Sequence, residues 1–221
     1  MPGPVNHTVG MSISHAQRER AELCDLFDRV GPDAATLCEG WTTRDLAAHL
    51  VVRERRPDAA LGILAAPFER HGEKVRLRAA ARPWDQLVQQ VRSGPPTLSL
   101  FGIPAIDRAA NTMEYFIHHE DVRRAVPDWT TRALDQAFED ELWNVVRRMS
   151  KLMVRSAPSG VTLAPPTSGS VVAHKGEPMV RVVGAAGELA LFVYGRQGHS
   201  QVELEGPADA VRALRDASFG I

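Results

Sequence analysis

The sequence predicts an α+β protein, in which a long helical part precedes a smaller part that mixes strands with a few helices. Two observations support this fold class. Up to residue 157, apolar residues recur at helical spacing in several long segments. Beyond a Pro-Ser-Gly turn at residues 158–160, short valine-rich runs alternate with turn residues, which is typical of strands. The change predicts a helical domain over residues 12–157 and a small α+β domain over residues 158–221.

Four principal helices and some shorter pieces are predicted in the first part. One of the four principal helices has an unusually complete start signal. Thr42 is a good N-cap with Asp45 three residues later, and Trp41 and Leu46 fit the two positions of a hydrophobic staple. Predicted helices cover residues 14–30, 42–56, 84–91, 105–126 and 131–154, with helix or turn over 61–68. The charged segment 69–82 is expected to form a solvated face, with an anion-binding rim as the alternative.

In the second part, alternation and turn residues define short elements. Strands are predicted over residues 161–163, 170–174, 179–183 and 201–205. Helices are predicted over residues 187–194 and 207–217, the last with Pro207 at its first helical position.

Composition limits the class of protein. The chain has 221 residues, of which 44% are hydrophobic and 24% charged, enough to bury a core. A formal net charge of −1 gives no basic surface for nucleic acid, so we expect no such partner. No apolar run approaches the roughly 20 residues of a membrane span, and no secretory signal is visible. We therefore expect a cytoplasmic protein without a membrane partner, and residues 1–11 are expected to form a flexible extension.

The strongest chemical feature lies in the helix predicted over residues 105–126. Glu114 and His118 are four residues apart, so their side chains share one helix face and could chelate one divalent ion. Asp121 lies on nearly the same face, where it could bind the ion or accept the imidazole N–H. His119 points elsewhere.

A third ligand must come from another helix, and His49 is the best candidate. It lies among apolar residues in the helix that begins after Thr42. With Glu114 and His118 it would make a two-histidine, one-glutamate set with an open fourth position, typical of catalytic zinc. Ordinary half-buried side chains remain the alternative at each position.

Other candidates carry weaker signals. Cys38 precedes the His49 helix and is interpreted as a small packing residue. Arg196 follows a predicted helix end and could contact an anionic ligand, although Gly195 beside it also suits a helix C-cap. Arg53 could serve the same purpose.

Two motifs and the tail of the sequence resemble a known family. LCEGWTTRDLAAHL (residues 37–50) and EYFIHHED (residues 114–121) are similar to the metal motifs of the mycothiol-dependent maleylpyruvate isomerase family. That family belongs to the wider DinB-like metal-binding bundles of actinobacteria. Residues 176–184, 187–189 and 194–196 resemble its small sterol-carrier-like C-terminal domain.

The resemblance implies a DinB-like four-helix bundle with a sterol-carrier-like tail. It also implies a divalent metal, most often zinc, held by His49, Glu114 and His118. Mycothiol enters as a possible cofactor only through this resemblance.

Two functions of different classes follow. One is a metal-dependent isomerase or transferase that takes a small-molecule thiol and a small electrophilic or unsaturated acid, acting as a monomer or homodimer. In this reading the metal holds the thiol as a thiolate, and Arg196 contacts the substrate. The other is a non-enzymatic metal- or ligand-binding module with a structural or regulatory role.

Overall fold

The computed structural model describes residues 13–56, 69–96 and 104–220, with side chains of the helix that starts at Pro104 described from Asn111 onward. The predicted α+β class is confirmed. The first part contains helices α1 (His15–Val30), α2 (Thr43–Arg55), α4 (Glu69–Ala80), α5 (Trp84–Arg92) and α6 (Pro104–Arg123). Then follow α7 (Gln136–Met153), β1 (Gly160–Ala164), β2 (Val171–His174), β3 (Met179–Val183), α8 (Ala186–Val193), the 3₁₀ helix η3 (Gln197–His199), β4 (Glu203–Glu205) and α9 (Ala208–Asp216).

The first two helices begin where the sequence predicts, because capping boxes fix both starts. In α1 the side chains of Ser14 and Gln17 satisfy each other's backbone N–H groups. In α2 Thr42 and Asp45 make the same arrangement. The flexible extension predicted for residues 1–11 and the helix or turn predicted for residues 61–68 lie outside the described residues. The segment predicted as a solvated face forms α4, whose charged side chains are mostly exposed while Val75 is buried.

Several predicted boundaries are wrong; strand β4, for example, begins at Glu203 instead of residue 201. Helix α6 ends at Arg123 instead of residue 126, and α7 begins at Gln136 instead of residue 131. The start of α7 is set by Asp135, whose side chain accepts the Phe138 N–H at 2.9 Å. Pro207 is the N-cap of α9 and not its first helical residue.

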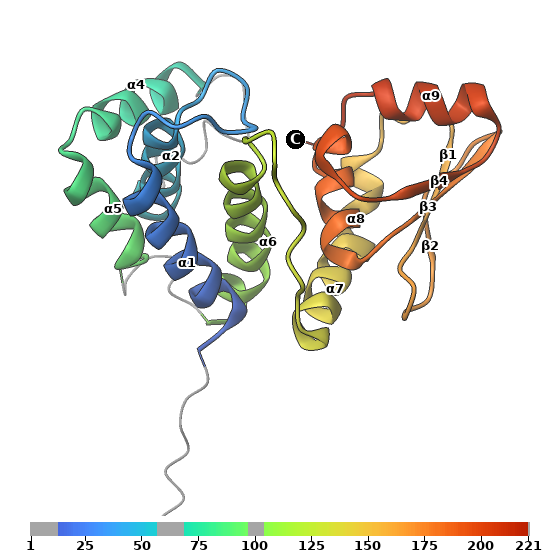
Figure 1. Ribbon diagram of the computed structural model, residues 1–221, viewed down its shortest axis with the longest axis horizontal. Coiled ribbons are helices and arrows are strands. Elements are labelled where there is room, and N and C mark those ends of the chain that lie inside the picture. The colour runs from blue at the N-terminus through green and yellow to red at the C-terminus, as the bar shows by residue number, and fades with distance from the viewer. Residues whose placement is uncertain (1–12, 57–68, 97–103, 221) are drawn as a thin grey trace, which may run out of the picture.

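Two hydrophobic clusters form the interior. One joins α1, α2, α4, α5 and one side of α6, and the other joins the opposite side of α6 to α7, the sheet, α8 and α9. We call the helices α1 to α6 the N-terminal lobe and the elements α7 to α9 the C-terminal lobe; residues 124–135 connect them (Figure 1). Helix α7 therefore packs with the tail. The domain limits at residues 12–157 and 158–221, and the four-helix count, stay predictions.

The C-terminal lobe contains a four-stranded sheet in the order β2-β1-β3-β4. Strands β1 and β3 are parallel, and the two outer pairs are antiparallel. Val161, Leu163, Val180 and Val182 are buried in the second cluster, which also contains residues of α7 and α8. No helix among the described residues is long and apolar enough to cross a membrane.

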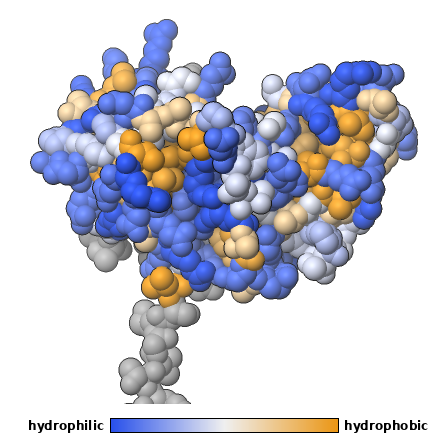
Figure 2. Space-filling view, in the orientation of Figure 1, coloured by the Kyte–Doolittle hydropathy of each residue, from blue (hydrophilic) through white to orange (hydrophobic). Residues whose placement is uncertain are grey.

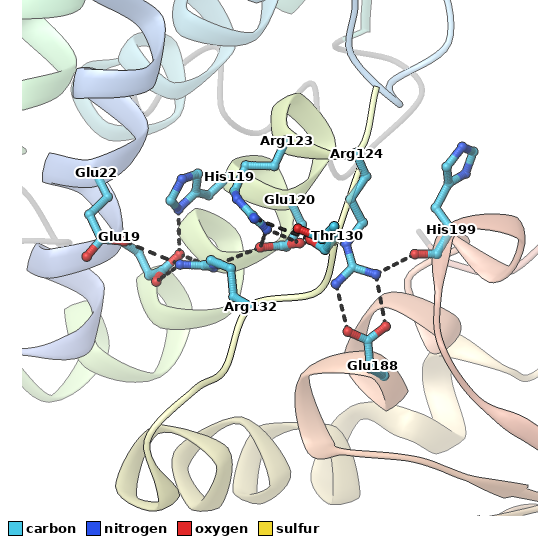
Figure 3. Close-up of polar contacts among 10 residues, drawn as sticks. All are labelled: Glu19, Glu22, His119, Glu120, Arg123, Arg124, Thr130, Arg132, Glu188 and His199. Carbon is cyan, nitrogen blue, oxygen red and sulfur yellow. Dashed lines mark hydrogen bonds and ion pairs between the residues drawn. The ribbon is translucent and has the colours of Figure 1, made fainter. Parts of the chain in front are cut away.

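The lobes meet through buried charges. Arg132 of the connecting segment contacts Glu19 of α1 at 2.8 Å and Glu120 of α6 at 2.6 Å. Arg124 contacts Glu120 at 2.5 Å and Glu188 of α8 at 2.7 Å. Figure 3 shows these side chains as one continuous network from α1 to α8. On the visible face, the surface between the lobes is mainly hydrophilic, and each lobe also carries an apolar patch (Figure 2).

This network predicts a loss of stability in acid. Burial by itself raises the pKa of Glu120, but the charges of Arg132 and Arg124 outweigh it and lower that pKa below its ordinary value. Its stabilising contribution is therefore complete above the unfolded value of about 4.3 and is lost as the pH falls through the lower, folded value.

We expect the free energy of unfolding, measured by urea denaturation and circular dichroism, to decrease between about pH 5 and pH 3. In Glu120→Gln this decrease should be smaller, because one of the titrating groups is gone. An unchanged pH dependence in the variant would contradict the role given to Glu120.

Candidate metal centre

His49 is presented by α2 toward α6. The capping box at Thr42 fixes where the helix begins, and His49 then lies two turns into it. Its ring is 5.2 Å from the ring of Trp41 and 5.3 Å from that of His118. The side chain is 12% exposed, so the imidazole lies mostly buried between the two helices and keeps a small part open to solvent.

Glu114 and His118 lie one turn apart on α6 and face His49. Glu114 Oε1 is 3.1 Å from His49 Nε2 and 3.4 Å from His118 Nε2. One ligand atom from each of these three residues lies within 4.8 Å of the others. The structure thus brings together the three side chains that the sequence analysis singled out.

Asp121 and Arg196 form a second layer behind His118. Asp121 is fully buried, and its Oδ2 is 2.9 Å from His118 Nδ1. Arg196 reaches from the C-terminal lobe and donates to both carboxylate oxygens of Asp121, at 2.8 and 2.7 Å. Arg196 therefore contacts the site by way of Asp121.

Arg53 lies on the other side of Glu114. It follows His49 by one turn on α2, its Nε is 3.2 Å from Glu114 Oε1, and it donates to the side chain of Asn111 at 2.5 Å. The carboxylate of Glu114 thus has one guanidinium and two imidazoles around it.

Cys38 is the site residue that the sequence analysis misread as packing. Its Sγ is 3.2 Å from Asp121 Oδ2 and 3.9 Å from His118 Nδ1, and Arg196 approaches it at 3.6 Å. The loop before α2 carries it there, because the Leu37 N–H donates to the Asp121 carbonyl at 3.0 Å. Its place next to the His49 motif was the one available signal.

Three groups of described residues have ligand atoms close enough for a metal ion: His49 with Glu114 and His118, Cys38 with His118 and Asp121, and Glu19 with Glu22 and His119. In the second group Arg196 already occupies both oxygens of Asp121. In the third, Arg132 occupies both oxygens of Glu19, at 2.8 Å each, and His119 accounts for a further contact. The first group is the one least neutralised by arginine.

The electrostatics of the first group differ from residue to residue. Burial lowers the pKa of His49, which favours the neutral imidazole that metals bind. Burial opposes ionisation of Glu114, but hydrogen bonds from His118 and His49 outweigh it and hold its pKa well below the usual range. Burial also opposes protonation of His118, yet Asp121 outweighs it and raises that pKa well above its usual value. A metal bound at Nε2 of His118 would take the place of the proton on that nitrogen, while Nδ1 keeps its contact with Asp121.

A cavity of about 260 Å³ lies between the lobes, away from this group. Its charged lining includes Glu120, Arg124, Arg132 and Glu188, which already pair with one another. The cavity does not include His49, Glu114 or His118. We therefore do not assign it to the chemistry of the candidate metal centre.

Comparison with family models and with curated proteins gives no match. Two solved structures are similar in fold. The crystal structure of the mycothiol-dependent maleylpyruvate isomerase aligns with a TM-score of 0.58 at 15% identity, over 86% of this chain and 88% of that chain. A structure of a histidine-to-alanine mutant of the isomerase aligns with a TM-score of 0.59 at 13% identity over the same shares. The resemblance inferred from the motifs is confirmed in three dimensions: the chain has the fold of the mycothiol-dependent maleylpyruvate isomerase.

Proposed function

We propose that the protein is a metal-dependent enzyme that uses a low-molecular-weight thiol, as an isomerase or as a thiol transferase. The observation that carries this proposal is the convergence of His49, Glu114 and His118 from two helices on one point. Three protein ligands from His and Glu, with a position left for a small molecule, are typical of catalytic zinc.

Two of the three separations among these residues fit a divalent metal. Two ligands bound tetrahedrally at about 2.0–2.1 Å from zinc are roughly 3.3 Å apart. The separations of Glu114 Oε1 from the two Nε2 atoms, 3.1 and 3.4 Å, agree with this value. The side chains are 12 to 23% exposed, which leaves access for a ligand from solvent. Zinc is the metal that we propose.

Asp121 and Arg196 would set the chemistry of His118. A carboxylate that accepts the Nδ1–H of an imidazole fixes its tautomer and leaves Nε2 free to bind a metal. Asp121 Oδ2 lies 2.9 Å from His118 Nδ1, close enough to accept this hydrogen bond, and the two hydrogen bonds from Arg196 hold Asp121 in place. Arg196 thereby supports the ligand from the C-terminal lobe.

A divalent metal bound here would keep a coordinating thiol deprotonated, and so supply a nucleophile for a conjugated double bond or an electrophilic carbon. Around it, Arg53 and Arg196 provide positive charge. We propose that they orient the carboxylate of a small unsaturated or electrophilic acid. The structural relatives are named for mycothiol and maleylpyruvate, and we propose this thiol and a related acid for the present chain.

The proposal predicts about one zinc per chain, bound by these three residues. Glu114→Ala and His49→Ala should each lose the zinc, as measured by atomic absorption on protein purified without a metal-binding tag. His174→Ala is the matched control, because His174 lies on β2 and donates to the Ser159 carbonyl instead. Full zinc content in Glu114→Ala would remove the basis of the proposal.

The second prediction concerns the reaction. Zinc-loaded protein should convert maleylpyruvate or a similar unsaturated acid only when a thiol is added, and mycothiol should be more effective than glutathione or cysteine. Arg196→Lys should reduce kcat at least tenfold, because lysine lacks the planar guanidinium that donates to both oxygens of Asp121. A protein that binds zinc but shows no thiol-dependent turnover would favour a non-enzymatic binding module.

A further inference from the structure

Two arginine–carboxylate pairs link the end of α6 to the C-terminal lobe in opposite directions; one is buried on both sides, and in the other the arginine side chain is 21% exposed. Arg196 of the C-terminal lobe donates to Asp121 of α6. Arg124, the residue that follows α6, donates to both oxygens of Glu188 in α8, at 2.9 and 2.7 Å. Asp121 and Arg124 are three residues apart, so both pairs start from the same end of α6. We call them the Asp121 bridge and the Glu188 bridge.

The Glu188 bridge is deeply buried and has additional contacts on each side. Arg124 is 2% and Glu188 8% exposed. Arg124 also donates to the His199 carbonyl at 2.6 Å, and Glu188 accepts the backbone N–H of Gln201 at 2.7 Å. Figure 3 shows Arg124 pointing between Glu188 and the His199 carbonyl. A bidentate, buried pair of this kind fixes geometry more strictly than a surface pair does.

Arg196 lies on the stretch of chain between these two anchors. Its N–H donates to the Leu191 carbonyl at 2.9 Å, and its own carbonyl accepts the His199 N–H at 2.9 Å. Arg124 therefore holds α8 before Arg196 and the end of η3 after it. The close packing of α8 on α6 adds to this, since a Cβ at Gly187 would come within 3.0 Å of Phe116 Cζ.

We infer that Arg124 and Glu188 are positioning residues: their bridge holds Arg196 in the place from which it fixes Asp121 and, through Asp121, His118. The inference rests on the proposed function in one respect, namely that His118 is a metal ligand. Among the described residues, Arg124 and Glu188 make their hydrogen bonds and ion pairs with groups other than His49, Glu114 and His118, so we infer that their effect on the site passes through Arg196.

Cys38 offers a direct reporter of where Arg196 lies. Arg196 Nη2 is 3.6 Å from its Sγ. The other cysteine, Cys24, is fully buried, and burial raises its pKa to about 12, so it stays silent toward thiol reagents in the folded protein. The limiting rate at high pH, where thiols are ionised, at which metal-free protein reacts with dithionitrobenzoate therefore measures access to Cys38, and Cys38→Ser should abolish that reaction.

The test compares Glu188→Gln, Arg196→Lys and the double variant. If the bridge positions Arg196, each single variant should raise the rate of Cys38 modification by about tenfold, and the double variant should react no faster than the faster single variant, because both changes release the same contact. Rates that multiply to about a hundredfold would mean two independent effects and would overturn the inference. If Glu188→Gln fails to fold, Arg124→Lys takes its place. That variant keeps the buried positive charge, and it should also raise the rate of Cys38 modification.

Glu54→Gln is the matched control. Glu54 also forms a buried pair with an arginine, Arg20 at 2.5 Å, but within the N-terminal lobe. It should leave the Cys38 rate within about twofold of wild type even where it lowers the free energy of unfolding. An equal increase in Glu54→Gln, or an unchanged rate in Glu188→Gln, would reduce the bridge to general stability.

Zinc affinity, measured by competition with a chromophoric chelator, tests the last step to His118. Glu188→Gln should bind zinc about tenfold more weakly than wild type, in the range found for residues that support metal ligands. If wild-type protein binds no zinc, the proposed function fails while the Cys38 rates still decide the inference. If zinc binds equally well in the variant, the step from Arg196 to His118 is wrong.

Discussion

The structure depends on the pairing of charges that the end of α6 carries into the interior. Residues 118–121 are consecutive, and their side chains point to four different neighbours: His118 to the candidate metal centre, His119 to Glu19 of α1, Glu120 to the arginines of the connecting segment, and Asp121 to Arg196. Leaving one partner of such a buried pair uncompensated costs several kcal/mol, on the order of 3–5. Each pairing therefore fixes one neighbouring element, and the same helix turn orders both the lobes and the site.

This arrangement explains why the candidate chemistry lies where it does. The three converging residues come from α2 and α6, and Asp121, which contacts His118, also lies on α6; its partner Arg196 belongs to the C-terminal lobe. A shared fold says little about reaction, because one fold can serve many activities. The donor atoms of this chain and their separations support a metal site, whereas the thiol is proposed from the names of the structural relatives.

Sequence reasoning reached the parts of the structure that depend on local signals. Thr42 and Asp45 predict the start of α2, and helix periodicity predicts that Glu114 and His118 lie on the same face of α6. The pairing with His49 needed only the assumption that two amphipathic helices face each other. Helix α7 was predicted to begin too early because its local start signal, the N-cap residue Asp135, was not used. Arg132, before that cap, instead contacts Glu19 and Glu120, which are more than ten residues away in the sequence.

Long-range charge pairs were beyond prediction for the same reason. Arg124 and Glu188 are 64 residues apart, and neither lies in a motif that suggests a partner. Cys38 comes to the site through one backbone hydrogen bond from Leu37, which no side-chain pattern announces. Such contacts are hard to predict from sequence, because an arginine or glutamate that will be buried cannot be told from one that will be exposed.

The opposed bridges also constrain how sequences of this fold can diverge. A chain that loses Arg124 leaves Glu188 as a buried carboxylate without its partner, which is costlier than losing both. The two positions should therefore be exchanged together during evolution, passing through an apolar pair of similar size or not at all. Asp121 and Arg196 would covary for the same physical reason, and a relative that keeps one bridge but not the other would reveal which of them serves assembly and which serves chemistry.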